Sequence, residues 1–192
     1  MLQRHEIAAE LHRRLPFLKT ILQQTEESSG ELRTRRLDWL FGKRRTCTLH
    51  SENGCRFAVD LASTYFSPRL LHERARIAAL VGSRRDRETV INMFSGVGCF
   101  SIQIAKASPA SIVYSININP DAVRYMLKNV RINKVEGKVV VMLGDSRRLT
   151  GEFLTGRTDR VLLPMPETSL LYVHAATMTI RKAGAWFTSM TS

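Results

Sequence analysis

Polar side chains follow three expected strands of this sequence, and their positions indicate a nucleotide-cofactor pocket. Asn92 opens the segment Asn-Met-Phe-Ser-Gly-Val-Gly at 92–98, directly after a β-branched run. Asn117 closes a second apolar run, and Asp145 follows a third. In open parallel sheets ligands bind outside the carboxyl ends of the strands, so these groups are expected to meet at one edge. The glycines of the first segment would let backbone N–H groups approach a ligand at a helix N-terminus.

Each of these signals alone has a plainer interpretation. Gly96 and Gly98 form only a Gly-x-Gly pattern, which also occurs in ordinary tight turns. Asp145 could simply cap a helix. Taken together the signals are more specific. Asn117 stands where a ribose-binding group is normally found, and the Asp145 carboxylate could accept a hydrogen bond from an adenine amino group.

The elements that must position these residues alternate between strand and helix downstream of residue 65. Ser67-Pro68 and Asn119-Pro120 are helix starts, in which an N-cap precedes proline at the first helical position. The strands are expected at 89–91, 111–116, 138–143, 159–163 and 185–190, and the helices at 67–82, 101–107, from 120 onward and between 167 and 182. In the helix from 120, the inward-facing residues are expected to be Val123, Met126, Leu127 and Val130. This order predicts an α/β fold with an open, doubly wound, Rossmann-like parallel sheet.

Upstream of residue 65 the pattern is that of a small α+β module. Apolar residues recur along a short basic helix between residues 2 and 15, and strands are expected at 18–22, at 31–40 and within 46–61. Glu52-Asn53-Gly54 interrupts the last of these and predicts a tight hairpin, since Asn and Gly tolerate positive φ. We therefore predict two units, a small module at 1–64 and a cofactor-binding domain at 65–192.

Composition limits the functional classes. The 192 residues are 44% hydrophobic, enough for one sizeable core, and 29 Lys and Arg against 17 Asp and Glu give a net charge of +12. A polyanionic partner is the leading expectation, with an ordinary basic surface as the alternative. The sequence lacks a signal peptide and any apolar run near the roughly 18 residues of a membrane span, so we expect a cytoplasmic protein without membrane contact. The cysteines Cys47, Cys55 and Cys99 lack the paired spacing of a zinc site, so no metal is expected and all three are interpreted as buried apolar residues.

Five segments carry a resemblance to a known enzyme family. They are GCRFAVDL at 54–61, YFSPRL at 65–70, ERARI at 73–77, MFSGVG at 93–98 and INPDA at 118–122. From about residue 15 to its end the sequence resembles the archaeal and eukaryotic tRNA (guanine-37-N1)-methyltransferases and the related wyosine-pathway aminocarboxypropyl transferases. The resemblance implies a class I fold that binds S-adenosyl-L-methionine (AdoMet) in the 65–192 domain, with the 1–64 module on the tRNA side. The anticodon-loop region of tRNA would be the polyanionic partner, and a monomer is expected.

The implied reaction requires two groups near the target guanine. Guanine N1 carries a proton at neutral pH, so methyl transfer needs a general base near N1 and a donor for the charge that builds on O6. By resemblance Glu73 is the base and Arg33 is the donor. From spacing alone, Glu73 could instead pair with Arg69 or Arg76, and Arg33 could belong to a phosphate-binding face. The cofactor-side residues that the resemblance implies are Tyr65, Arg74, Phe94, Ser95, Gly96, Gly98, Asn117, Ile118, Asp145, Ser146 and Pro164.

Three residues depart from the family pattern. The first strand of the domain usually ends in aspartate and the second in an acidic residue that binds the ribose hydroxyls, but here they end in Asn92 and Asn117. An amide still accepts a hydrogen bond, but without charge assistance each change could cost about 1 to 1.5 kcal/mol, so weaker cofactor binding is expected. Pro164 stands where the methyltransferases have an asparagine that holds the guanine, and proline has neither a polar side chain nor an N–H.

Three functions stay open at this point. The first is AdoMet-dependent methylation of N1 of guanine at tRNA position 37. The second, which the proline at Pro164 leaves open, is transfer of the aminocarboxypropyl arm of AdoMet in the wyosine pathway. The third is tRNA binding without catalysis. Relatives commonly carry a further N-terminal module and further C-terminal strands, so the sequence is expected to be a fragment, a reduced family member, or a chain whose sheet edge a partner covers.

Overall fold

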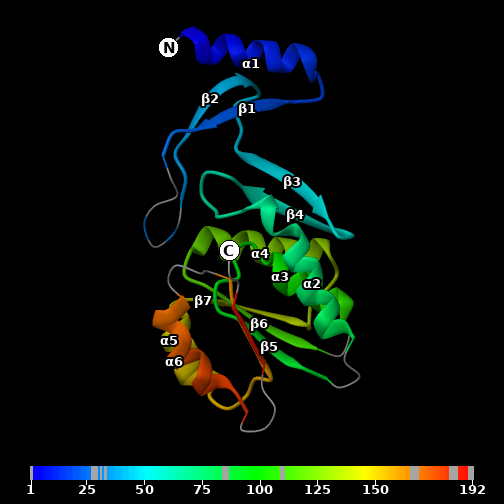
Figure 1. Cartoon of the computed structure of the whole chain (residues 1–192), viewed down its shortest axis with the longest axis vertical. Coiled ribbons are helices and arrows are strands. Elements are labelled where there is room, and N and C mark those ends of the chain that lie inside the picture. The colour runs from blue at the N-terminus through cyan, green and yellow to red at the C-terminus, as the bar shows by residue number, and fades with distance from the viewer. Residues whose placement is uncertain are drawn as a thin grey trace.

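The N-terminal end of the molecule is a helix packed on a hairpin. The computed structural model describes residues 2–26, 30, 32, 34–83, 87–108, 111–164, 169–181 and 186–189, and the statements below refer to these residues. The helix α1 (Leu2–Arg14) lies across β1 (Thr20–Gln24) and β2 (Leu37–Gly42), which pair antiparallel (Figure 1). Both strands begin later than predicted. Leu18 turns back on the end of α1, where its N–H donates to the Leu15 carbonyl at 3.0 Å, and β2 starts only opposite the last residue of β1.

A second hairpin follows the first. β3 (Cys47–Glu52) and β4 (Cys55–Asp60) pair antiparallel, with Glu52 opposite Cys55. Asn53 has a φ of 48° and Gly54 a φ of 70°, the left-handed conformations of a tight two-residue turn. The hairpin predicted at Glu52-Asn53-Gly54 is therefore confirmed.

The main sheet has five parallel strands in the described part of the chain. They are β5 (Thr89–Asn92), β6 (Ile112–Asn117), β7 (Val139–Leu143), β8 (Arg160–Leu163) and β9 (Trp186–Ser189), in the spatial order β7-β6-β5-β8-β9. The helices are η1 (Pro68–Leu70), a 3-10 turn, α2 (Leu71–Gly82), α3 (Cys99–Ala107), α4 (Pro120–Ile132), α5 (Ser146–Phe153) and α6 (Ser169–Thr179). The chain reverses its direction of travel across the sheet after β7, so the predicted open, doubly wound α/β fold is confirmed.

Apolar side chains fill both faces of the sheet. On one face β4, α2, α3 and α4 cover the strands, and Phe57, Ile77 and Ile102 are buried there. The other face is covered by α5 and α6 (Figure 1). Ile116 and Val161 are buried there in a second cluster. Because β4 contributes side chains to the first cluster, the core continues across residue 64. The division of the chain near residue 65 stays a prediction.

The outer edge of β4 is bound by two asparagines of α4. The Oδ1 atom of Asn129 accepts from the Ala58 N–H at 2.7 Å, and its Nδ2 donates to the Ala58 carbonyl at 3.0 Å. Asn133, one helical turn later, makes the same pair of bonds with the backbone of Arg56 at 2.9 and 2.7 Å. These amides satisfy backbone groups of a strand edge that would otherwise be buried without partners.

The structure tests the predicted element boundaries. Strands of the main sheet begin and end within one residue of the prediction. The helix α5 was expected only as the alternative in which Asp145 caps a helix, and that cap is observed. Asn119 caps α4 as predicted, accepting from the Asp121 N–H at 2.9 Å, whereas the Ser67 side chain makes no capping bond before η1. Within the described ranges, no helix is long and apolar enough to cross a membrane and no group of three His, Cys, Asp or Glu side chains could hold a metal ion.

Two burial predictions are wrong. Cys47 is exposed, because it lies at the solvent-facing start of β3, while Cys55 and Cys99 are buried as predicted. Leu127 is 45% exposed, whereas its neighbour Met126 faces the core. Leu127 lies just beyond the stripe of α4 that contacts the sheet and β4.

We expect Asn129→Ala to lower the free energy of unfolding by about 2 to 4 kcal/mol, because buried backbone groups of Ala58 and Val97 lose their hydrogen-bond partner. Urea denaturation monitored by circular dichroism measures the change. Arg131→Ala, on the exposed face of the same helix, is the matched control and should stay within about 0.5 kcal/mol of the unsubstituted protein. Equal losses in the two variants would contradict a specific role for the Asn129 amide.

Candidate functional site

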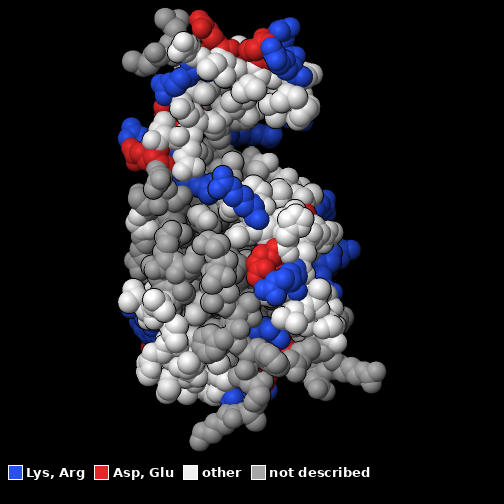
Figure 2. All heavy atoms as spheres, in the orientation of Figure 1, with Lys and Arg blue, Asp and Glu red and all other residues white. Residues whose placement is uncertain are grey.

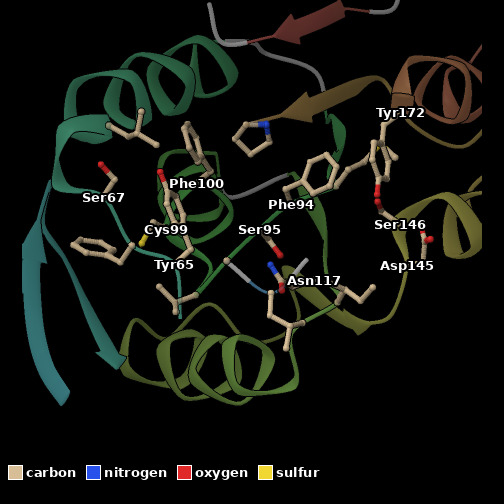
Figure 3. Close-up of a pocket in the computed structure, with 18 of the residues that line it drawn as sticks. Tyr65, Ser67, Phe94, Ser95, Cys99, Phe100, Asn117, Asp145, Ser146 and Tyr172 are labelled. Atoms are coloured by element: carbon tan, nitrogen blue, oxygen red, sulfur yellow. The ribbon is translucent and has the colours of Figure 1, made fainter. Parts of the chain in front are cut away.

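A cavity of about 440 Å³ lies at the carboxyl ends of β5, β6, β7 and β8. Ten predicted cofactor-side residues line it, namely Tyr65, Arg74, Phe94, Ser95, Gly96, Asn117, Ile118, Asp145, Ser146 and Pro164. Tyr65 and Phe100 lie toward one end of the cavity, and Asp145 and Tyr172 lie at the other (Figure 3). The strand ends therefore meet at one edge of the sheet, as the parallel topology requires.

The loop after β5 is fixed to the neighbouring strand. The Ser95 hydroxyl and N–H both donate to the Ile116 carbonyl, at 2.8 and 2.9 Å. Gly96 has a φ of 53° and lines the cavity, where an added Cβ would meet only the Tyr65 carbonyl at 3.6 Å. Gly98 is not among the lining residues. Its φ is 92° and an added Cβ would lie 2.9 Å from Cγ of Met126, so the glycine is needed for the turn and for packing beneath the loop.

The two amides at the strand ends occupy different environments. Asn92 is buried and outside the lining, where its Nδ2 donates to the Ser101 hydroxyl at 3.2 Å and its Oδ1 accepts from the Phe94 N–H at 3.3 Å. Asn117 lines the cavity, and its Oδ1 accepts from the Asn119 N–H at 2.8 Å (Figure 3). This bond assigns the amide orientation and leaves Nδ2 as the group for a ligand. The site thus presents a donor at Asn117, where a carboxylate would present acceptors.

Asp145 acts as a helix cap and as an ion-pair partner. Its Oδ1 accepts from the Arg147 N–H at 2.8 Å, which begins α5, and its Oδ2 accepts from Nη2 of Arg147 at 2.8 Å. The guanidinium of Arg147 holds the pKa of this carboxyl below its usual range. A carboxylate has about four lone-pair directions, so Asp145 keeps acceptor capacity toward the cavity.

Aromatic side chains form one wall of the cavity. The rings of Phe94 and Tyr172 meet edge to face at 4.6 Å between centroids, and Cζ of Arg147 lies 5.0 Å from the centre of the Tyr172 ring. Tyr172 comes from α6 and was not predicted. The sequence of that helix is apolar on all sides, so its pattern gave no signal of which residue would reach the cavity.

The opposite end of the cavity is built by the segment that leads from β4 into α2. Arg74 lines the cavity although its side chain is 3% exposed, and it pairs with the buried carboxylate of Glu52. Nη2 of Arg35 donates to the Phe66 carbonyl at 2.9 Å, and its Cζ lies 5.3 Å from the centre of the Tyr65 ring. Phe66 and Phe100 also line this end, and neither was predicted.

The two predicted catalytic residues have different outcomes. Glu73 lies in the first turn of α2 but is not among the lining residues, and both its oxygens accept from Arg76, from Nε and Nη2 at 2.7 Å each. The hydrogen bonds from Arg76 hold the pKa of Glu73 below its usual range. The plainer interpretation, a pair with Arg76, is therefore observed in this state. Arg33 lies outside the described residues, although Gly30 and Leu32 beside it line the cavity.

Comparison with known proteins identifies the family of the chain. The model of the TRM5/TYW2 methyltransferase domain matches residues 48–187. The tRNA (guanine(37)-N(1))-methyltransferase Trm5b of Methanocaldococcus jannaschii is 36% identical over 181 residues, which are 94% of this chain and 50% of the relative. A solved complex of aTrm5 and tRNALeu is similar with a TM-score of 0.82 at 38% identity, covering 94% of this chain and 51% of that one. The structure of M. jannaschii TYW2 in complex with AdoMet has a TM-score of 0.67 at 31% identity and covers 77% and 64%.

The extent of these matches has two consequences. The chain spans about half the length of the Trm5 proteins that it matches, 50% of the M. jannaschii relative and 51% of the solved aTrm5 chain. The matched segment 48–187 includes β4 to β8, all of β3 except its first residue, and every strand end at the cavity. Because the family model covers most of the sequence, the chain belongs to the TRM5/TYW2 methyltransferase family that the sequence resemblance indicates.

Proposed function

We propose that this chain is the catalytic part of an AdoMet-dependent tRNA methyltransferase that acts on N1 of guanine at position 37. The observation that supports it best is the shared cavity, which joins Asn117 and Asp145 from the sheet with Tyr65 and Arg74 from the segment before it. Similarity to a Trm5 protein solved with tRNALeu supports tRNA as the substrate. In this proposal residues 1–64 lie on the tRNA side and residues 65–192 on the cofactor side. Action as a monomer and in the cytoplasm stay predictions.

The cavity suits AdoMet in size and in chemistry. Its volume of about 440 Å³ is within the range of roughly 300 to 1,000 Å³ typical of small-molecule sites. Asn117 is proposed to bind the ribose hydroxyls and Asp145 the adenine amino group, while Ser95 and Gly96, in the loop after β5, face the methionine part. Phe94 and Tyr172 give the apolar contact that a purine and its ribose require. When bound, AdoMet supplies the activated methyl group.

Two residues are proposed to act on the guanine. Glu73 accepts the N1 proton, and for this it must exchange its bonds with Arg76 for a bond to the base. Such an exchange is inexpensive, because the Arg76 side chain is 58% exposed and surface ion pairs contribute little. Arg33 stays the predicted donor to O6 and belongs to the segment whose neighbours Gly30 and Leu32 reach the cavity.

The surface charge favours an RNA partner. Lys and Arg side chains occur from the α1 end of the molecule to the main-sheet end on the face shown in Figure 2, and acidic groups are fewer. The net charge of +12 agrees with this distribution. Since phosphate contacts supply most of the sequence-independent affinity for nucleic acids, this surface is proposed to hold the tRNA backbone.

Mass spectrometry of nucleosides from tRNA treated with the protein and AdoMet tests the proposed function. One methyl group added at guanine 37 is the expected result. An added aminocarboxypropyl group would replace the proposal with the second function, for which Pro164 in place of an asparagine is the specific observation. Bound tRNA without any added group would indicate tRNA binding without catalysis.

Asn117→Asp should tighten AdoMet binding about tenfold, because a charge-assisted hydrogen bond to the ribose replaces a neutral one. Isothermal titration calorimetry with AdoMet and with adenosine measures the effect, and both ligands should gain because both contain the ribose. Asn92→Asp is the matched control. Its side chain is outside the cavity lining, so less than a twofold change in Kd is expected. An unchanged Kd in Asn117→Asp would remove Asn117 from the ribose site.

Glu73→Gln should slow single-turnover methyl transfer about 100-fold or more while the Kd for AdoMet stays within twofold, because only a general base is lost. Glu136→Gln, an exposed carboxylate at the amino end of β7, is the matched control and should not change the rate. Normal turnover of the Glu73→Gln variant would exclude Glu73 as the base.

The pH profile adds an independent readout for Glu73. Because the pKa of Glu73 is lowered by Arg76, the carboxylate stays ionised below the usual pH range and loses this form only as pH falls through the lowered pKa. In a plot of the methyl-transfer rate against pH, Arg76→Ala should therefore shift the fall in rate at low pH to higher pH values.

tRNA binding should weaken at least tenfold between about 50 and 200 mM salt, because bound cations are released from several phosphates when the protein binds. Filter binding at a series of salt concentrations measures the slope. AdoMet binding in the same buffers is the control, since a small zwitterionic ligand releases few counterions. Salt-independent tRNA affinity would be inconsistent with a phosphate-binding surface.

A further inference from the structure

A buried ion pair stands directly behind the cavity. Arg74 of α2 and Glu52 at the end of β3 are 3% and 5% exposed. Nη2 of Arg74 donates to Oε2 of Glu52 at 2.6 Å, and Nε lies 2.6 Å from Oε1 at an angle that is not that of a hydrogen bond. Removing both charges from water is costly, so a buried pair adds little net stability over neutral residues of similar size. Stability therefore does not explain the Arg74–Glu52 pair, and its position behind the cavity indicates its role.

Arg74 connects the pair to the cavity wall. Its Nη1 and Nη2 both donate to the Ser67 carbonyl at 3.2 Å, in the segment between β4 and α2. Its Cζ atom lies 5.6 Å from the centre of the Phe66 ring and 6.0 Å from that of Phe100. Ser67, Phe66 and Phe100 all line the cavity, so the guanidinium ties together three parts of one wall.

Glu52 is held from two further directions. Nε2 of Gln103 in α3 donates to its Oε1 at 2.7 Å, and Nε2 of His50 lies 3.1 Å from its Oε2. The Oε1 atom of Gln103 accepts in turn from Nδ2 of Asn53 at 2.9 Å. The Glu52 carboxylate therefore connects the hairpin to Arg74 of α2 and to Gln103 of α3, beside the bonds of the Asn53 amide, and it fixes the orientation of Arg74.

We propose that Glu52 is a positioning residue for the methionine end of the cofactor, which it serves by holding Arg74 against the Ser67 carbonyl. This inference rests on the proposed function, because AdoMet is the ligand it assumes. Asn117 and Asp145, proposed for the ribose and the adenine, lie away from the wall of Tyr65, Ser67 and Phe100 (Figure 3). Glu52 lies behind this second wall, which therefore faces the methionine arm. If the wall is loosened, the binding of AdoMet should weaken more than the binding of adenosine.

The chain contains a matched control for this pair. Arg160 of β8 and Glu88, which precedes β5, are 1% and 4% exposed, and Nε and Nη2 of Arg160 donate to the Glu88 carboxylate at 2.9 and 3.1 Å. The two pairs agree in residue types and burial, and in both the Nε and Nη2 side of the guanidinium faces the carboxylate, although Nε is a hydrogen-bond donor only in Arg160. Neither Arg160 nor Glu88 lines the cavity, so a purely structural effect should be the same in both pairs.

Calorimetric titration of AdoMet and adenosine into the full chain, with melting temperatures measured in parallel, tests the proposal. Glu52→Gln should raise the AdoMet Kd at least tenfold and the adenosine Kd less than twofold. Glu88→Gln should lower the melting temperature by a similar amount and change both Kd values less than twofold. The double variant Glu52→Gln with Arg74→Gln should regain much of the melting temperature, because no unpaired charge is left, and should still bind AdoMet weakly.

Several outcomes would overturn the inference. An AdoMet Kd in Glu52→Gln within twofold of the unsubstituted protein would do so, and so would equal losses for AdoMet and adenosine. If Glu52→Gln does not fold, the double variant decides the question, since tight AdoMet binding without the pair leaves it no positioning role. Absence of AdoMet binding by the unsubstituted chain would overturn the proposed function itself, which separates the two failures.

Discussion

The site depends above all on how the β3–β4 hairpin is bound to the helices α2, α3 and α4. Asn129 and Asn133 bind the free edge of β4, and Glu52 binds the turn to α2 and α3. The chain then runs from β4 through 61–70 into α2, and this segment forms one wall of the cavity. The sheet alone supplies only the opposite wall. A shift of the hairpin would therefore change the cavity without moving any strand of the main sheet.

Sequence reasoning succeeded where one physical rule determines the outcome. Parallel strands place their carboxyl ends at one edge, so Asn117 and Asp145 could be expected together from strand positions alone. A tight turn needs residues that tolerate positive φ, and for this reason Asn53-Gly54 predicted a hairpin. The strands of the main sheet could also be predicted, because runs of β-branched residues end at polar groups. The resemblance to a family added Tyr65 and Arg74, which spacing alone could not supply.

The unpredicted parts of the site involve residues whose sequence pattern is compatible with more than one contact. Phe66, Phe100 and Tyr172 line the cavity, but an apolar side chain at a cavity wall has the same sequence pattern as one in a core. Helical spacing allowed Glu73 to pair with Arg69 or with Arg76, and only the folded geometry selects Arg76. The α5 helix stayed an alternative because Asp145 could be interpreted as a helix cap or as a ligand-binding group, and in the structure it caps the helix and lines the cavity.

In the proposed function, the amide at Asn117 changes the charge of the cofactor site more than its hydrogen-bonding capacity. A ribose hydroxyl both donates and accepts, so in the proposed contact it would accept from Nδ2 of Asn117, without charge assistance. The attraction between a carboxylate and the cationic sulfonium of AdoMet is lost at the same time. Phosphates of an approaching tRNA, however, meet less negative charge beside the cavity, in a chain that already carries +12. Under the proposed function, Asn117 in place of an acidic residue would therefore lower the affinity for the cofactor and raise the affinity for tRNA. Asp145 would add little negative field because Arg147 neutralises it.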